Sequence, residues 1–414
     1  MRTQRAYYPW LVVALLWFVA LLNYMDRQML STMRPSMQVD IAELESGANF
    51  GRLMAIFLWI YGIVSPFAGM LADKLNRKWL IVFSLFVWSG VTFAMGYAEN
   101  FEQLYWLRAV MGFSEAIYIP TALALIADYH GSKTRSLAVG IHMTGLYLGQ
   151  ALGGFGATIA EQFSWQHAFL LFGFVGMAYS LVLAFFLREK KQSLLSPEAK
   201  SGRAFSGGTV FRGLGLLLSN ISFWIILFYF AVPSVPGWGV KNWLPTLFSN
   251  KLGIDMATAG PLSTITIAAS SFIGVIFGGM LSDRWVQRNL RGRIYTSAIG
   301  LALTVPALLL VGFGYSLFHI VSAAFCFGFG FGMFDANNMP ILCQFVSPRY
   351  RATAYGLMNM GGVFSGALIT DWLGKSTDGG NLGRDFAYLS VIVLVMLIIQ
   401  LLFLRPKQVD ASAD

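Results

Sequence analysis

A short motif occurs twice in this 414-residue chain, at places 210 residues apart. The first copy, Gly-Met-Leu-Ala-Asp-Lys, covers residues 69–74, and the second, Gly-Met-Leu-Ser-Asp-Arg, covers residues 279–284. Each copy ends a long apolar segment and begins a basic one. The repetition indicates a duplicated chain, and a duplicated, mostly apolar chain is typical of membrane proteins built from two parallel repeats.

Composition supports a membrane location. Hydrophobic residues make up 56% of the chain and charged residues 12%, about half the charged share of a soluble globular protein. A soluble core cannot absorb so much apolar surface, so we expect the remainder to face lipid. At about 20 residues for each crossing, the apolar segments predict twelve transmembrane helices. Their predicted spans are 10–33, 50–72, 79–98, 103–127, 135–159, 166–187, 214–247, 258–282, 294–313, 316–342, 352–374 and 384–404.

A polar stretch separates the sixth and seventh apolar segments. It contains Pro197 and three glycines, which are typical of a linker. We therefore predict an N-terminal six-helix bundle (1–187), a cytoplasmic linker (188–212) and a C-terminal six-helix bundle (213–414). The expected fold class is an all-α integral membrane protein with two pseudo-symmetric bundles.

The basic residues predict the orientation, because Lys and Arg favour cytoplasmic loops. With the N-terminus inside, 21 of the 29 basic residues fall on the inner side. Both termini are therefore expected in the cytoplasm, and the first apolar run is read as a retained helix rather than a signal peptide. The net charge of +9 is explained by this topology and by anionic lipid headgroups, without a nucleic-acid partner.

Several charged residues fall inside predicted helices, where an ionisable side chain is costly and indicates function. The first helix contains Asn23, Asp26 and Arg27, and the fourth contains Arg108 and Glu115. Arg108 and Glu115 are seven residues apart, hence on one helical face. We expect these two acids and two bases to meet within the N-terminal half.

This cluster suggests a proton switch. Desolvation favours the neutral form of a carboxyl group, whereas a nearby guanidinium favours the charged form. An anionic substrate that occupied Arg27 would free Asp26 or Glu115 from its counter-charge and make it easier to protonate, so that proton and anion move together. The alternative is a structural ion-pair network that joins the first and fourth helices.

The repeated motif resembles the loop signature of the major facilitator superfamily, and its first copy continues as Asn76-Arg77-Lys78. Residues 165–169, Trp-Gln-His-Ala-Phe, lie where that family often has Trp-Arg-x-x-Phe. We expect the motif glycines to permit close helix approach and its aspartates to cap a helix or pair with basic neighbours, latching one conformation; a merely solvated charge cluster is the alternative. The predicted latch residues are Gly69, Asp73, Arg77, Arg135, Gly279, Asp283, Arg284 and Arg351.

Three motifs resemble the anion:cation symporter branch of that superfamily. They are Asn-Tyr-x-Asp-Arg at 23–27, Arg-x₆-Glu-Ala at 108–116 and Asn-Trp-x-Pro at 242–245. The resemblance implies that Asp26 and Glu115 couple protons and that Arg27 binds the substrate carboxylate. It also implies substrate contacts for Tyr24, Tyr61, Gln150 and Asn359.

The tenth segment departs from this pattern, because it carries Asp335, Asn337 and Asn338 before Pro340. The two amides are expected either to read sugar hydroxyls or to satisfy backbone groups that the proline frees. Asp335 is a candidate protonation site or cation ligand, so sodium coupling stays open beside proton coupling.

The seventh segment contains two prolines and two glycines within residues 233–239, which should break the helix and form a gate. Lys241 is expected either to attract anions or, as we favour, to extend to the membrane interface. In the fifth segment, Tyr147 and Gln150 are candidate sugar contacts. His142 is expected to be a structural hydrogen-bonding residue rather than a proton shuttle.

No enzymatic motif is present, neither a P-loop nor a Gly-x-Ser-x-Gly or His-Glu-x-x-His sequence, so we expect neither catalysis nor a metal or other cofactor. The predicted substrate-binding residues are Asn23, Tyr24, Arg27, Tyr61, Arg108, Tyr147, Gln150, Lys241, Asn337, Asn338 and Asn359. We predict a monomeric symporter of a sugar acid such as a hexuronate, aldonate or sialic acid, in a bacterial inner membrane. The alternatives are a proton-coupled lysolipid or amphiphile exporter, since the acid–base pattern also resembles the Spinster-like carriers, and a membrane sensor without transport.

Overall fold

The computed structural model describes residues 7–131, 134–189, 217–219, 221–347 and 351–406, and every regular element in these ranges is helical. The first half contains α1 (Tyr8–Asp40), η1 (Ala42–Glu45), α2 (Gly47–Lys74), α3 (Arg77–Met95), α4 (Phe101–Ala116), α5 (Tyr118–Tyr129), α6 (Arg135–Gly153), α7 (Gly156–Gln162) and α8 (Trp165–Phe186). The second half contains α11 (Ile221–Leu252), α12 (Met256–Val286), α13 (Gly292–Phe313), α14 (Leu317–Asp335), α15 (Asn338–Phe345), α16 (Arg351–Asp378) and α17 (Leu382–Phe403).

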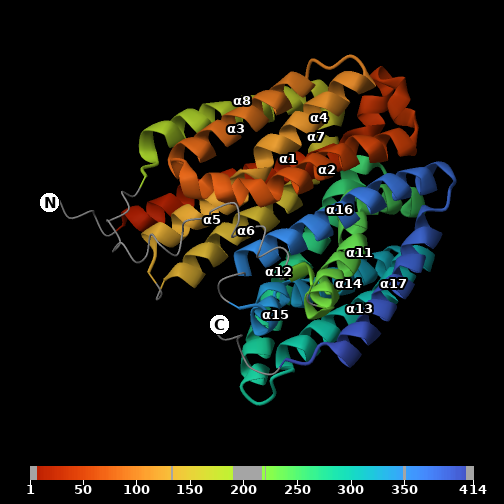
Figure 1. Cartoon of the computed structure of the whole chain (residues 1–414). Helices are drawn as coiled ribbons and strands as arrows, with labels where there is room; N and C mark the ends of the chain where they lie inside the picture. Colours follow the sequence, from red (N-terminus) through yellow and green to blue (C-terminus); the bar gives the residue numbers. More distant parts are fainter. Residues whose placement is uncertain (1–6, 132–133, 190–216, 220, 348–350, 407–414) are drawn as a thin grey trace.

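Ten of the helical segments in these described ranges are long and apolar enough to cross a membrane, counting α4 with α5 and α14 with α15 as one crossing each. The pair α6–α7 and helix α16 lie among them in the bundle (Figure 1). All twelve predicted spans match an observed helix or helix pair to within about five residues, except the end of the first and the start of the seventh, which are each seven residues off. The crossing count itself and the side of the termini stay predictions.

The helix breaks differ from those that we expected. The fourth, fifth and tenth segments are each interrupted, at Ile117, near Gly154 and at Ala336–Asn337. The predicted break at residues 233–239 is wrong, because α11 runs without interruption through Pro233, Pro236 and Pro245. The glycines in this stretch serve packing instead: a Cβ atom on Gly237 would lie 2.6 Å from the ring of Phe331.

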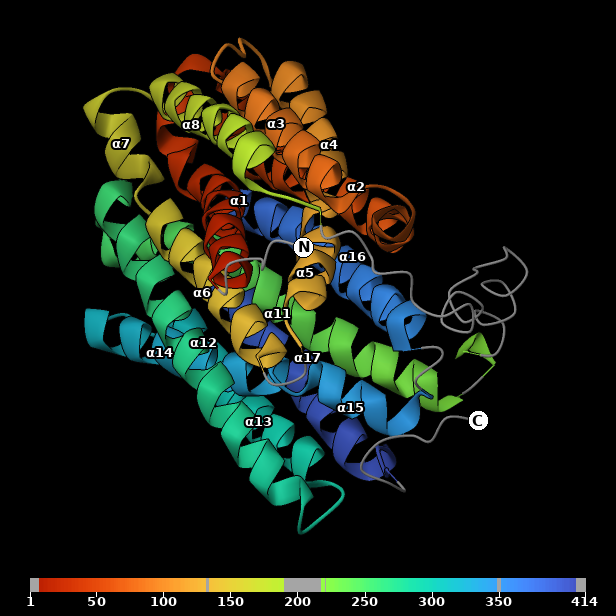
Figure 2. The same cartoon turned by 90° about the vertical axis from the view of Figure 1, so that its left-hand side faces the viewer.

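The helices form two bundles, α1–α8 and α11–α17, which lie one above the other in Figure 1 and are seen from the side in Figure 2. α2 lies along α16, and α6 lies along α12. We call the end at which α1 begins and α17 ends the terminal face, and the end with η1 and the α16–α17 turn the distal face. Of the predicted linker (188–212), all but residues 188 and 189 lies outside the described residues.

The two bundles are in tight contact near the distal face. A Cβ atom on Gly47 of α2 would lie 2.7 Å from the carbonyl oxygen of Gly374 in α16. On the other side of the interface, a Cβ atom on Gly154 would lie 2.9 Å from the carbonyl oxygen of Gly260 in α12. Only glycine permits so close an approach of two backbones. The distal ends of the interface helices are therefore closed against each other.

The same helices are separated near the terminal face. Added Cβ atoms on Gly140 of α6, Gly279 of α12 and Gly356 of α16 would meet no atom of the described residues within 4 Å. The expectation that Gly279 permits close helix packing is therefore wrong for this conformation; its neighbour Gly278 is the one that touches Met333 in α14. The tight glycine contacts of the distal face are thus not repeated at these three positions near the terminal face.

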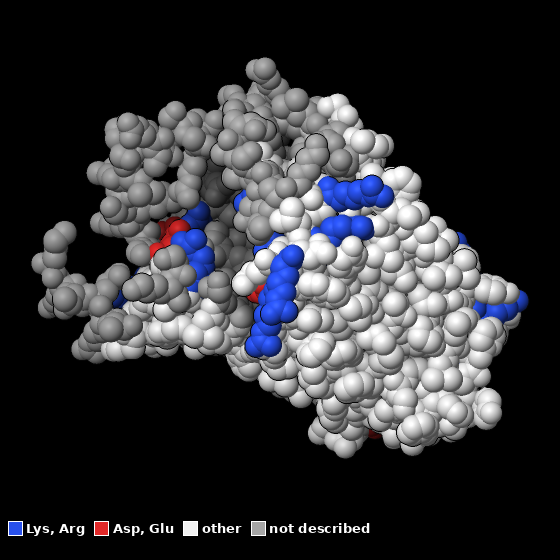
Figure 3. Space-filling view, turned by 90° about the horizontal axis from the view of Figure 1, so that it is seen from below, with Lys and Arg blue, Asp and Glu red and all other residues white. Residues whose placement is uncertain are grey.

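Basic side chains are prominent at this end of the molecule. Figure 3 shows lysine and arginine side chains grouped on the underside, with few acidic ones among them. The α12–α13 turn supplies Arg288 and Arg291, and Arg291 donates to the carbonyl oxygen of Leu401 at the end of α17. This distribution supports a cytoplasmic position for the terminal face.

Candidate functional site

An ion pair joins α1 to α4 inside the first bundle. The Nε atom of Arg27 lies 2.6 Å from Oε2 of Glu115, whose side chain has no exposed surface, whereas that of Arg27 is 12% exposed. Glu115 stands in the last turn of α4, immediately before the break at Ile117. The pair confirms that the first and fourth segments bring these two charges together.

Three aromatic rings surround the Arg27 guanidinium. Its central carbon lies 4.8 Å from the ring centres of Phe57 and Tyr61 and 5.1 Å from that of Tyr24. The aromatic faces attract the cation and hold the planar group in place. Its buried Nη2 atom has no hydrogen-bond partner among the described residues. Arg27 therefore retains a donor for an anion.

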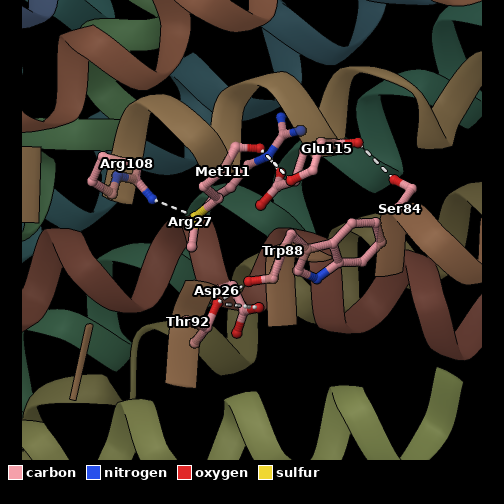
Figure 4. Close-up of polar contacts among 9 residues, drawn as sticks. Asp26, Arg27, Ser84, Trp88, Thr92, Arg108, Met111 and Glu115 are labelled. Carbon is pink, nitrogen blue, oxygen red and sulfur yellow. Dashed lines mark hydrogen bonds and ion pairs between the residues drawn. The ribbon is translucent and has the colours of Figure 1, made fainter. Parts of the chain in front are cut away.

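The other two charges of the first bundle lie apart from this pair (Figure 4). Asp26 accepts a 3.3 Å hydrogen bond from Thr92 of α3, and its Oδ1 atom is buried without a partner among the described residues. Arg108 contacts the Met111 sulfur at 3.1 Å and lies 4.6 Å above the Phe57 ring. The expected meeting of two acids and two bases is thus reduced to one bonded pair, because successive residues of α1 point to different neighbours.

A cavity of about 290 Å³ lies between the two bundles. Its lining includes Tyr24, Tyr147 and Gln150 from the first bundle and Lys241, Asp335, Asn338 and Tyr355 from the second. Three predicted substrate residues of the first bundle are thus at its wall, and Tyr24 connects the wall to Arg27. Such a mixture of aromatic walls and few polar groups is typical of a small-molecule site.

Lys241 occupies this central wall. Our favoured interpretation, that its side chain extends to the membrane interface, is wrong: its Nζ atom lies 5.1 Å from the ring centre of Trp238 and it lines the cavity. Its carbonyl oxygen accepts a 2.9 Å hydrogen bond from Gln28 of α1. The prediction for Lys241 was wrong because its acidic neighbour in the cavity, Asp335, is distant in sequence.

The two amides beside Asp335 have separate roles. Asn337 is fully buried, and its Nδ2 donates to the carbonyl oxygen of Met333 at 2.8 Å, so it satisfies backbone at the α14–α15 break. Asn338 lines the cavity and donates to Oδ1 of Asp335 at 3.1 Å. Asn337 therefore matches the backbone interpretation, and contact of Asn338 with a sugar hydroxyl stays a prediction.

The breaks in the fourth and tenth segments share a sequence signal that we did not use. Glu115 and Asp335 are each followed by alanine and, five residues on, by proline: Glu-Ala-Ile-Tyr-Ile-Pro and Asp-Ala-Asn-Asn-Met-Pro. In each case the acid stands at or next to the end of one helix, and the proline lies in the first turn of the next, a favourable place for proline. Arg27–Glu115 and Lys241–Asp335 are therefore equivalent base–acid sets in the two repeats.

Four other residues have specific positions. The ring of Tyr61 faces the Arg27 guanidinium. Asn23 of α1 is fully buried. Asn359 donates to Ser65 at 3.1 Å and so links α16 to α2 across the two bundles. His142 lies 3.0 Å from the Tyr118 hydroxyl, which donates to the carbonyl oxygen of Leu16. This bonding matches the structural role that we favoured for His142.

Only some of the predicted latch residues can be placed in detail. The surroundings of Gly69 and Asp73 lie outside the described part of the chain. Arg77 pairs with Asp128 of α5, and Asp283 and Arg284 are exposed.

Arg135 and Arg351 form a repeated contact. Arg135 donates to the carbonyl oxygens of His130 and Ala127, and Arg351 donates to those of Val346 and Cys343, five and eight residues back in both cases. The two arginines thus cap the ends of α5 and α15 in the same way. This equivalence supports the duplication inferred from the motif.

The fold and the duplicated sites define a membrane transporter of two repeats rather than an enzyme. The model of the Major Facilitator Superfamily matches residues 16–370, and the chain belongs to this family.

Known proteins of two kinds are similar to more than nine tenths of the chain. The D-galactonate transporter of Escherichia coli O6:H1 is 22% identical over 93% of each chain. The sphingosine-1-phosphate transporter SPNS2 of Xenopus tropicalis is 24% identical over 91% of this chain and 76% of its own. Among solved structures, a bacterial homologue of the lysosomal transporter Spinster, in its inward-facing and unoccupied conformation, superposes with a TM-score of 0.79 at 20% identity and covers 97% of both chains.

Proposed function

We propose that this transporter carries a small polyhydroxy organic anion, such as a hexuronate, aldonate or sialic acid, together with a proton. The observation that carries the proposal is the state of Arg27, which is held by Glu115 through one nitrogen and has a buried Nη2 atom without a partner among the described residues, next to the cavity-lining Tyr24. A planar guanidinium is well suited to a carboxylate, because it offers parallel donors.

Coupling follows from competition for Arg27. The substrate carboxylate takes part of the charge that now neutralises Glu115. Glu115 is then a buried carboxylate with a weakened counter-charge, and it binds a proton more readily. The bound proton and the bound anion together add no net charge to the site. This neutrality lowers the cost of closing the two bundles around the substrate.

Asp26 is the second proposed coupling acid. It does not touch Arg27, and its one described partner is Thr92. It precedes Arg27 on α1 and so points about 100° away from it around the helix, and its side chain is buried in the first bundle (Figure 4). We infer that it binds a proton without contact with the substrate.

In this proposal the conformation is open to the cytoplasm. The distal face is closed by glycine contacts between α2 and α16, such contacts are not repeated at the three glycines near the terminal face, and the basic residues favour a cytoplasmic position for the terminal face. The proposed location is the bacterial inner membrane, with the protein as a monomer and the proton as coupling ion.

Export of a lysolipid is the second candidate, supported by the similarity to SPNS2. The small anion is favoured because Lys241, Asp335, Gln150 and Asn338 offer polar partners for it in a cavity of about 290 Å³, among apolar lining residues such as Phe230, Val275 and Phe331. The D-galactonate transporter, whose name supports a sugar acid, matches 93% of this chain.

A counterflow assay separates these candidates. Proteoliposomes preloaded with a uronate, an aldonate, a sialic acid or a lysolipid are diluted into labelled substrate, with and without a proton gradient. We expect exchange of a sugar acid in both conditions and uphill accumulation only with the gradient. Exchange restricted to the lysolipid, or accumulation that requires sodium and ignores the proton gradient, contradicts the proposal.

A further inference from the structure

We propose that Asp335 and Lys241 select the end of the substrate that lies opposite its carboxylate, accepting a hydroxyl group and rejecting a second carboxylate. The protein would then carry polyhydroxy monocarboxylates and exclude dicarboxylates of the same size. This inference rests on the proposed function, since it assumes that Arg27 binds one carboxylate of the substrate.

Asp335 presents an open acceptor to the cavity. It is the last residue of α14 and is exposed into the space between the bundles. One carboxylate oxygen, Oδ1, accepts from Asn338 at 3.1 Å. An ionised carboxylate only accepts hydrogen bonds, so its remaining capacity fits a hydroxyl or an ammonium group and is repelled by another carboxylate.

Lys241 supplies the complementary donor. It lines the same cavity from α11 and makes no ion pair within 4.0 Å with Asp335 in the described part of the chain. Its ammonium group lies beside the Trp238 ring. A base and an acid that share a wall without bonding each other leave one donor and one acceptor for a third group.

A hydroxyl group satisfies both at once, because it donates one hydrogen bond and accepts others. A terminal carboxylate satisfies only Lys241 and places its charge beside Asp335, whereas an amine satisfies only Asp335 and meets the charge of Lys241. Site groups built to bond a hydroxyl reject the analogue that leaves them unpaired. The second bundle is thus suited to a sugar-like tail.

The equivalent pair in the first bundle is bonded internally and stands behind the cavity wall. Arg27 and Glu115 are joined at 2.6 Å, which leaves Nη2 of Arg27 and Oε1 of Glu115, both buried, without a hydrogen-bond partner among the described residues. In the proposal the substrate carboxylate takes the Arg27 donor next to the wall residue Tyr24, and the hydroxyl end lies at Lys241 and Asp335.

Competition between two sugar acids tests this inference. The labelled substrate is the monocarboxylate exchanged fastest in counterflow, and the competitors are D-galactonate and galactarate, which differ only in a terminal CH₂OH against a carboxylate. In the wild-type protein we expect galactonate to compete at least tenfold better. In Asp335→Asn we expect this preference to fall to threefold or less, through stronger competition by galactarate.

The controls keep the result interpretable. Asp371→Asn removes an acid of the same bundle whose i,i+4 partner is Lys375 on the surface, and it should leave the preference unchanged. Lys241→Gln should weaken competition by galactonate while galactarate stays excluded, and it provides an independent test if Asp335→Asn fails to fold by size-exclusion chromatography.

Two outcomes overturn the inference alone: equal competition by both acids in the wild type, or an unchanged preference in Asp335→Asn. If no monocarboxylate exchanges at all, the proposed function itself fails, and the inference falls with it. Counterflow of any sugar acid therefore distinguishes the two failures.

Discussion

The two bundles hold equivalent base–acid sets in different ways. In the first bundle Arg27 is bonded to Glu115, and the acid is shielded from any solvent. In the second bundle Lys241 and Asp335 both face the cavity, and Asp335 instead accepts from Asn338. The acids stand at the same kind of helix break, yet one is enclosed and the other is open.

This difference teaches how a duplicated fold can hold a site that is not duplicated. A buried ion pair contributes little net stability, because desolvation offsets the attraction, but it cannot lose one partner without a replacement charge. A substrate carboxylate at Arg27 or a proton on Glu115 supplies that replacement. An open pair is hydrated and can bind a substrate group directly. We therefore assign proton coupling to the first bundle and recognition of the substrate tail to the second.

The largest effect is expected for Arg27→Ala, which removes the proposed carboxylate donor. Truncating one partner of a buried, hydrogen-bonded charge pair costs about 2–5 kcal/mol, so substrate affinity should fall at least about thirtyfold. Binding is measured by scintillation proximity or by quenching of tryptophan fluorescence. Arg27→Lys should recover only part, because an ammonium lacks the planar fork, and the exposed Arg52→Ala on α2 is the matched control. Unchanged affinity in Arg27→Ala contradicts the assignment.

Glu115→Gln should separate exchange from accumulation. The amide still accepts from Arg27 but does not take up a proton, so counterflow continues while uphill uptake driven by a proton gradient is lost. The two activities are compared in the same proteoliposomes. The control is Glu102→Gln, which changes an exposed acid in the first turn of α4. Normal proton-driven accumulation in Glu115→Gln would show that Glu115 does not couple protons to transport.

Asp26→Asn should abolish proton-driven accumulation with less effect on binding than Arg27→Ala. Its side chain contacts Thr92 and not the ion pair (Figure 4), so the cavity wall stays intact. The measurement pairs substrate affinity with accumulation, and Asp371→Asn is again the control. A large loss of affinity with intact accumulation would assign Asp26 to substrate binding and leave Glu115 as the coupling acid.

The sequence alone predicted the positions of the helices, because hydropathy fixes membrane helices strongly. It also predicted that the charges of the first and fourth helices meet, and of the four charges only Arg27 and Glu115 form an ion pair in the described part of the chain. It did not predict that Asp26 turns to Thr92, since the face of α1 that each residue presents depends on how α1 is rotated against α3 and α4. It also misplaced Lys241, whose acidic neighbour in space is 94 residues away in sequence. The uninterrupted α11 shows that local proline and glycine content is a weak guide where neighbouring helices support the backbone.

The smallest effect concerns the contact that joins the bundles at the distal face. Asp378 of α16 accepts hydrogen bonds from the backbone nitrogens of Gly47 and Ala48 and, at 2.9 Å, from the Ser46 hydroxyl at the start of α2. Burial raises the pKa of Asp378, but these hydrogen bonds and the charge of Arg34 outweigh it and lower the pKa below its ordinary value. A lowered pKa means that the contact is complete above the ordinary aspartate value of about 3.9 and is lost only as pH falls through the lowered value. Any pH dependence of transport between about pH 5 and 8 must then come from other groups.

Asp378→Ala should weaken this closed distal face by roughly 1 kcal/mol, the usual loss for a helix N-cap, which is about fivefold in a conformational equilibrium. Spin labels on the distal ends of α2 and α16, in a background with Cys326 and Cys343 replaced by serine, report the two conformations by pulsed electron paramagnetic resonance. We expect a larger population with separated distal ends in Asp378→Ala and no change in Asp371→Ala, about two turns away on the same helix. Identical distance distributions in Asp378→Ala and the wild type would show that the glycine contacts alone close this face, and the charged cap would then be dispensable for alternating access.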